Sequence, residues 1–109
     1  MNIASSIEQG RRLHPSRPAL LFEGEEISYA ALDEAASRAA HVLRGLGVQP
    51  GDRVALCLPN IPAFVYAYFG ALKIGAIVTS VNTSLTADEV RFVLEDSGAV
   101  VLVTTPALR

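Results

Sequence analysis

Three kinds of side chain in this sequence could in principle do chemistry: one cysteine, two histidines and a group of glutamates. Cys57 is the only cysteine, and it lies inside the apolar run 54–58. A cysteine nucleophile needs an activating base or positive surroundings, whereas a cysteine among apolar residues behaves as a small hydrophobic side chain. We therefore expect Cys57 to be buried and not catalytic. A single cysteine also excludes an intrachain disulfide, which suits a reducing compartment, so we expect a cytoplasmic location.

The histidines and glutamates do not form a recognisable site either. His14 and His41 are far apart in the sequence, so together with the single thiol they give no metal-ligand pattern. Glu23, Glu25 and Glu26 fall in an expected hairpin loop. Solvated charge is the ordinary interpretation there, because a raised carboxyl pKa requires burial.

Glycine-rich phosphate-binding loops are missing from the sequence. It contains no Gly-x-x-x-x-Gly-Lys-Ser/Thr string. Gly45, Gly47 and Gly51 follow an expected helix and precede an expected strand, which is the reverse of the order in a dinucleotide-binding loop. A helix stop and a turn explain these glycines. We therefore assign no catalytic, cofactor-binding or metal-binding residue.

A polar cluster follows the second of three expected strands. Its members are Thr79, Ser80, Asn82, Thr83, Ser84 and Thr86. Ligands of open α/β sheets bind at the carboxyl ends of strands, so this cluster is a candidate binding site. Turn formation and helix capping explain the same residues equally well, and the sequence leaves both interpretations open.

The first half of the chain predicts a helix, a β-hairpin and a second helix. We expect a helix from Ile3 to Leu13 and a hairpin of 19–22 and 27–29 joined by the four-residue loop 23–26. A helical period then starts at Tyr29, with Ser28 as N-cap and Gly47 in the left-handed position after the helix, so that Val48 contacts Leu43. The expected apolar stripe is Tyr29, Leu32, Ala36, Ala39, Leu43 and Leu46; the opposite face carries Asp33, Glu34, Ser37, Arg38, His41 and Arg44.

The second half predicts strands and helices in alternation. The expected strands are 53–58, 76–81 and 99–104; Asn60 caps a helix over 61–74, and Gly75 ends it. Thr86–Glu89 matches a capping box, with Leu85 and Val90 as its hydrophobic staple, and starts a helix that runs to Asp96. Helical crossovers imply parallel strands, and strands that are apolar without alternation are expected to be covered on both faces.

The run from Ile61 to Val81 is almost wholly apolar, with Lys73 its only charge, and it is long enough to cross a bilayer. Gly75 and the β-rich residues after it favour a buried helix followed by a buried strand instead. Such a helix needs protein on every side, which 109 residues can hardly supply. The net charge is -2 without a basic run, so nucleic acid and anionic membranes are poor candidates for partners.

Several ordered motifs resemble the adenylate-forming superfamily, which includes acyl-CoA synthetases, peptide-synthetase adenylation domains and luciferase. The matching segments are Ile27–Leu32 for the first core motif, Leu46–Ala55 for a helix-to-strand joint, Leu58–Asn60, Ala71–Val78 for the second core motif, and Leu85–Thr104. The resemblance covers essentially the whole chain and is closest to ligases of fatty acids or other carboxylates with CoA. The family commonly has prolines near Ser80 and Thr83, and their loss here would loosen that turn.

The resemblance implies that residues 1–109 are an incomplete part of the large N-terminal domain, without the C-terminal domain. It also implies a reaction in which ATP and a carboxylate give an acyl-adenylate, from which CoA displaces AMP, with Mg²⁺ assisting. The family's phosphate loop, adenine pocket, ribose-binding aspartate and catalytic lysine lie downstream of the matched motifs. We therefore carry over no catalytic residue, and we expect the chain alone to be inactive and to bind no cofactor tightly.

Three functional hypotheses remain open. The leading one is a part of an acyl-CoA synthetase that packs against the rest of that domain, or that self-associates through exposed strand edges. The second is a free-standing α/β module that binds a nucleotide at Asn82–Ser84. The third is a non-catalytic piece that docks on a complete synthetase.

Overall fold

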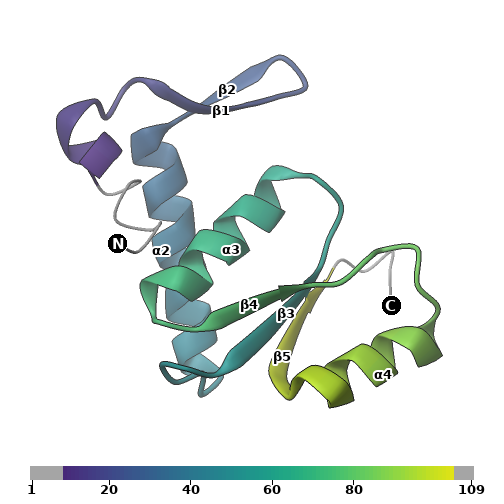
Figure 1. The fold of residues 1–109 in the computed structure, drawn as a ribbon. Helices are drawn as coiled ribbons and strands as arrows, with labels where there is room; N and C mark the ends of the chain where they lie inside the picture. The colour runs from purple at the N-terminus through teal and green to yellow at the C-terminus, as the bar shows by residue number, and fades with distance from the viewer. Residues whose placement is uncertain (1–8, 105–109) are drawn as a thin grey trace.

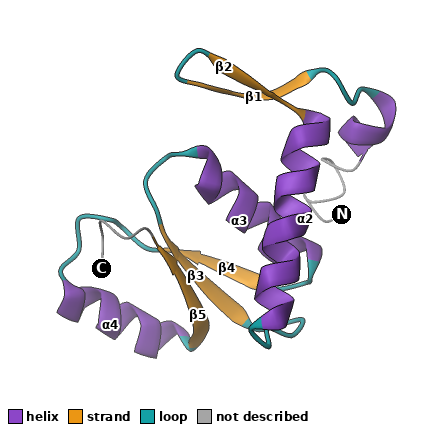
Figure 2. Ribbon diagram, turned by 180° about the vertical axis from the view of Figure 1, so that it is seen from behind, coloured by secondary structure: helices purple, strands orange, loops and turns teal. Residues whose placement is uncertain are grey.

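The computed structural model describes residues 9–104, which form an α/β fold (Figures 1 and 2). The elements are β1 (Pro18–Phe22), β2 (Glu25–Ser28), α2 (Tyr29–Gly45), β3 (Arg53–Cys57), α3 (Pro62–Lys73), β4 (Ile77–Ser80), α4 (Ala87–Ser97) and β5 (Ala99–Thr104). Residues 9–13 are helical as well. The rest of the helix predicted for 3–13 lies outside the described residues. The predicted α/β class and order of elements are confirmed.

The strands 53–57, 77–80 and 99–104 form a parallel sheet in the order β4-β3-β5, as the helical crossovers predict. Alternate side chains of β3 enter two separate cores. Val54 and Leu56 pack with α2 and α3, while Ala55 and Cys57 pack with α4. Helices therefore cover both faces of the central strand, and Figure 2 shows α4 on the opposite side of the sheet from α2 and α3.

Glycines end α2 and α3 as the sequence predicts. After α2, the Gly47 N–H donates to the Arg44 carbonyl and the Val48 N–H donates to the Leu43 carbonyl, with Gly47 at a φ of 92°. These are the two hydrogen bonds of a Schellman motif. Leu43 and Val48 join the same buried core, so the turn directs the chain into β3.

The start of α3 differs from the prediction. Asn60 does not cap this helix; the N-cap is Ile61, without a side-chain hydrogen bond, and Pro62 occupies the first turn. Proline suits that position because its φ is already helical and its missing N–H would have no partner there. The choice of Asn60 as the cap was therefore wrong by one residue.

The hairpin loop is also shorter than predicted. Two residues, Glu23 and Gly24, connect β1 and β2, and both have positive φ, at 50° and 81°. Positive φ at both central positions is the pattern of a type I′ turn, whose twist matches the flanking strands. Glu25 and Glu26 consequently belong to β2, paired with Phe22 and Leu21, and not to the loop.

The capping box of α4 is confirmed. The Thr86 hydroxyl accepts from the Glu89 N–H, and the Glu89 carboxylate accepts from the Thr86 N–H. These backbone and side-chain hydrogen bonds from Thr86 hold the pKa of Glu89 below its ordinary value. Leu85 and Val90 both pack against one buried cluster, as the predicted staple requires.

Substituting Thr86→Ala should destabilise the start of α4 by about 1 kcal/mol, because one N-terminal amide loses its acceptor. Hydrogen exchange of the amides of α4 would measure the loss, with Thr83→Ala as the control, since Thr83 is an exposed neighbour before the helix. Equal protection of α4 in the two variants would contradict this role of Thr86.

The apolar stripe of α2 is confirmed at Leu32, Ala36 and Leu43, which are buried. Tyr29 and Ala39 are half-buried, and Leu46 is 63% exposed. Leu46 is the C-cap residue, where the chain leaves the helical path before Gly47. On the face expected to be polar, Asp33 is buried; its partners are described with the site below.

Much of the apolar surface of the described residues remains uncovered. Only Ala67, Gly70 and Ala71 of α3 are fully buried, and its large apolar side chains are half-buried at most. The prediction that both faces of the strands are covered holds for β3 and is wrong for β4 and β5, whose residues are exposed or half-buried. Within residues 9–104, no helix combines the length and apolar character needed to span a membrane.

Candidate functional site

A hollow of about 560 Å³ lies at the carboxyl ends of β3 and β4. Its residues come from the two segments that leave these strands, and from the first turns of α3. They are Leu58, Pro59, Asn60, Phe64, Ser80, Val81, Asn82 and Thr83. The hollow therefore occupies the edge where open parallel sheets place their ligands, as the sequence predicts.

Half of the predicted polar cluster reaches this hollow. Ser80, Asn82 and Thr83 line it. Thr79 is instead paired beside Ala55 within the sheet, and Thr86 is committed to the capping box. Three residues of the cluster therefore line the hollow, while Thr79 and Thr86 serve the sheet and the cap of α4.

Asn82 itself serves the turn. Its side-chain oxygen accepts from both the backbone N–H and the hydroxyl of Ser84, at 2.9 and 2.8 Å. This Asx turn fixes the chain where the family commonly has prolines. The expected looseness of that segment is therefore offset by local hydrogen bonds.

The chemistry available in the hollow is neutral. Its polar side chains are two amides and two hydroxyls, and its lining includes no lysine, arginine, aspartate or glutamate. Phosphate groups are held by cationic side chains or by a ring of backbone amides, and Mg²⁺ prefers carboxylate ligands. The side chains that line this hollow therefore offer no charged group to a nucleoside triphosphate or to its metal.

The other side chains considered from the sequence lie apart from this hollow. Cys57 is buried against α4, and its carbonyl accepts a hydrogen bond from the Thr104 hydroxyl. His14 and His41 are both exposed. Glu23, Glu25 and Glu26 are exposed on the hairpin, and no metal-binding cluster of His, Cys, Asp or Glu occurs within 9–104.

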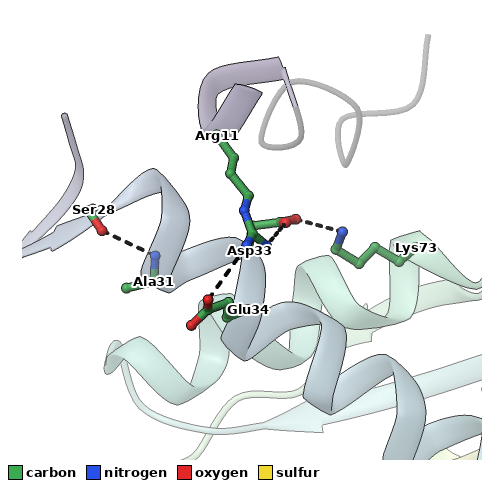
Figure 3. A network of polar contacts seen from close by, with 6 residues as sticks. All are labelled: Arg11, Ser28, Ala31, Asp33, Glu34 and Lys73. Atoms are coloured by element: carbon green, nitrogen blue, oxygen red, sulfur yellow. Dashed lines mark hydrogen bonds and ion pairs between the residues drawn. The ribbon is translucent and has the colours of Figure 1, made fainter. Parts of the chain in front are cut away.

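The one buried charged side chain among these residues is Asp33, which joins three helical segments (Figure 3). One carboxylate oxygen accepts from Lys73 Nζ on α3 at 2.7 Å, and the other accepts from Arg11 Nη1 at 2.8 Å. Arg11 also lies 3.5 Å from Glu34. Both oxygens of Asp33 are satisfied, so the network ties the segment 9–13 and α3 to α2.

The electrostatics of Asp33 favour its ionised form. Burial by itself would raise the pKa of Asp33, but the hydrogen bonds and charges of Lys73 and Arg11 outweigh burial and hold the pKa below its ordinary value. A carboxylate that stays ionised between two cations is a structural anchor and not a proton donor at neutral pH.

Sequence analysis missed this network, although one signal pointed to it. Lys73 is the only charge in the run from Ile61 to Val81, and a charge carried into a core needs a partner. Asp33 follows the buried Leu32 at the border of the apolar stripe of α2. The sequence could therefore have suggested Asp33 as the partner of Lys73.

Comparison with known proteins decides the family. Residues 7–109 match the family described as "AMP-binding enzyme". The chain belongs to the AMP-binding enzyme family. The resemblance to adenylate-forming enzymes that the core motifs indicated is thereby confirmed.

Two curated relatives show what share of a full-length ligase the chain covers. It is 39% identical over 98 residues to crotonobetaine/carnitine–CoA ligase of Salmonella paratyphi A, covering 85% of the chain and 19% of the relative. It is 38% identical over 104 residues to long-chain-fatty-acid–CoA ligase FadD13 of Mycobacterium tuberculosis, covering 94% and 21%. The chain thus spans about a fifth of the length of these relatives.

A solved member of the family shows the same fold. The N-terminal domain of FACL13 from Mycobacterium tuberculosis matches with a TM-score of 0.88 at 38% identity, covering 95% of the chain and 27% of that domain. The chain therefore has the fold of about a quarter of that N-terminal domain.

Proposed function

We propose that the chain is a structural part of an ATP-dependent carboxylate–CoA ligase that acts through an acyl-adenylate, with fatty acids as the substrate class. The match of residues 7–109 to the AMP-binding enzyme family carries this proposal. ATP, Mg²⁺ and CoA would serve the complete enzyme. A cytoplasmic location belongs to the same proposal, and the unpaired, buried thiol of Cys57 supports it.

The chain by itself is inactive in this proposal. Its candidate site lacks the charged side chains that grip a triphosphate or a metal, and α3 leaves large apolar side chains half-buried. Residues 1–109 accordingly act as an incomplete N-terminal domain whose role is to supply sheet strands and packing helices.

We expect the purified chain to give no carboxylate-dependent exchange between pyrophosphate and ATP above the blank. The M. tuberculosis ligase, assayed with the same acids, is the positive control. Robust exchange by the chain alone would refute the proposed inactivity.

A chimera tests the ligase assignment separately from inactivity. Residues 7–109 replace the matching stretch of the M. tuberculosis ligase, and formation of acyl-CoA is measured. Acid-dependent activity supports the assignment, because a foreign fold could not complete the domain. A folded chimera without activity would count against it.

The nucleotide-binding module remains the second candidate, favoured only by the position of the hollow at the carboxyl edge of the sheet. Calorimetric titration of the chain with ATP, AMP and CoA separates the two. Binding at micromolar strength would favour the module. The third candidate is a piece that docks on a complete synthetase, and co-purification of the chain with the intact M. tuberculosis ligase would favour it.

A further inference from the structure

A second hollow, of about 220 Å³, lies where α2 packs against the end of α3. Ala40 and Ile74 are its apolar lining residues, and both are buried. The other lining side chains all carry hydrogen-bond donors; they are Ser37, His41, Arg44 and Lys73. Three of these four can be cationic, and the lining includes no acidic residue. The hollow therefore concentrates positive charge in a chain whose net charge is -2.

Three of the donors lie on one face of α2. Ser37, His41 and Arg44 follow one another at the spacing of neighbours on a helix surface, and all three are exposed. Within residues 9–104, neither His41 nor Arg44 has an acidic partner. Both side chains can therefore donate to a ligand without giving up an ion pair.

Lys73 borders the hollow from α3, but its ammonium group is already bound to Asp33 at 2.7 Å. The carboxylate of Asp33 balances most of this charge, and Asp33 itself does not line the hollow. The positive charge available to a ligand consequently comes from Arg44, with His41 adding to it when protonated.

The carboxyl ends of two helices also lie near this hollow, and their partial negative charge would repel an anion. Their last carbonyl groups are already occupied, however. The carbonyls of Leu43, Arg44, Ala71 and Leu72 each accept a hydrogen bond from a backbone N–H of the turn that follows. The guanidinium of Arg44 is therefore not needed as a cap.

We propose that this hollow binds the phosphate group of a small soluble ligand, held by Arg44, His41 and Ser37. A guanidinium presents a fork of N–H groups that matches two phosphate oxygens. The serine hydroxyl and the imidazole N–H are donors for the remaining oxygen. The volume is several times the roughly 30 Å³ that one water molecule occupies, so a phosphate group fits with some of its waters. The site uses neither the hollow at the carboxyl edge of the sheet nor the ligase assignment, so its test does not depend on the proposed function.

The experiment titrates the purified chain with inorganic phosphate and with pyrophosphate, and follows the backbone amide resonances by NMR. Sodium chloride keeps the ionic strength constant, because exposed charges are screened by salt. The test variants are Arg44→Gln and His41→Gln. The control is Arg38→Gln, which removes the same charge from an exposed position of α2 outside the hollow. Lys73 stays unchanged because it holds Asp33, and circular dichroism verifies that each variant is folded.

We expect saturable binding at millimolar concentrations or below by the wild-type chain and by Arg38→Gln, with the largest shifts in residues 37–44. Arg44→Gln should bind about 10-fold more weakly or worse, the usual effect of losing a hydrogen bond to a charged group. His41→Gln should lose less. Absence of saturable binding by the wild-type chain, an equal loss in Arg38→Gln, or equally strong binding of acetate would overturn the inference.

A lipid headgroup is the other source of a phosphate group, and sedimentation with phosphatidylcholine vesicles that contain phosphatidic acid tests it. The net charge of -2 without a basic run favours a soluble ligand. Retention on these vesicles that Arg44→Gln abolishes, without binding of soluble phosphate, would overturn the soluble ligand. Calorimetric binding of ATP that Arg44→Gln abolishes would support this site, since Arg44 does not line the hollow at Asn82.

Discussion

Replacing Gly70 with alanine is expected to lower the free energy of unfolding by about 1–3 kcal/mol, as is usual when a packed contact is overfilled. A Cβ at Gly70 would lie 2.8 Å from the carbonyl oxygen of Ala36 and 2.9 Å from the amide nitrogen of Ala40. These are backbone atoms of α2, so no side-chain rotation can relieve the clash. The two helices would have to separate where α3 is most deeply buried.

Gly45→Ala is the matched control for this substitution. Gly45 is also a helical glycine, but nothing lies within 4 Å of a Cβ built there. Alanine should therefore stabilise this site by up to about 1 kcal/mol through its better helix propensity. Denaturant unfolding followed by circular dichroism measures both changes, and a stabilising Gly70→Ala would show that the helices do not cross as closely as described.

Substituting Asp33→Ala should cost about 3 kcal/mol, because removing one partner of a buried ion pair leaves the other charge poorly compensated. The side chains of Asp33 and Lys73 are 9% and 12% exposed, so solvent screens this pair weakly. Arg11 is the internal comparison, since its side chain is 42% exposed. Arg11→Ala should therefore lose much less stability than Asp33→Ala. Equal losses would mean that the contact with Lys73 is not the dominant one.

The same carboxylate gives a pH dependence with a defined sign. Its folded-state pKa lies below the ordinary value, so the unfolded state takes up a proton first as the pH falls. The stabilisation by Asp33 is therefore complete above about pH 5 and is lost progressively as the pH falls through about 4 toward the lower, folded-state pKa. Unfolding free energies measured between pH 6 and 3 should show a steeper decline in the wild-type chain than in Asp33→Asn. Parallel curves would exclude this contribution.

The local signals of the sequence predicted the regular parts of the fold well. The period of α2, the glycine after each helix and the capping box of α4 all depend on residues within one or two turns of each other. The parallel sheet followed from the helical crossovers alone. Two local predictions were wrong. The cap of α3 was placed at Asn60 and not at Ile61, where Pro62 starts the helix. The loop of the hairpin was placed at Glu23–Glu26 and not at the two-residue turn Glu23–Gly24.

Tertiary contacts were not accessible in the same way. The buried position of Asp33 depends on Lys73, which is 40 residues away in the sequence, and the close crossing at Gly70 depends on three small residues of α2. Neither has a local pattern. The position of the candidate hollow was predictable because it follows from topology, but its neutral lining and the use of Asn82 in a turn depend on side-chain geometry.

The first strand of the parallel sheet to be synthesised on the ribosome, β3, lies in the middle of the finished sheet. β3 is made first, yet its contact with β5, such as the hydrogen bond from Thr104 to Cys57, joins residues 47 positions apart. Until residue 104 leaves the exit tunnel, the most deeply buried strand of the sheet, β3, lacks its neighbour on one side. A nascent chain that stalls within α4 would consequently present this flank to chaperones and proteases.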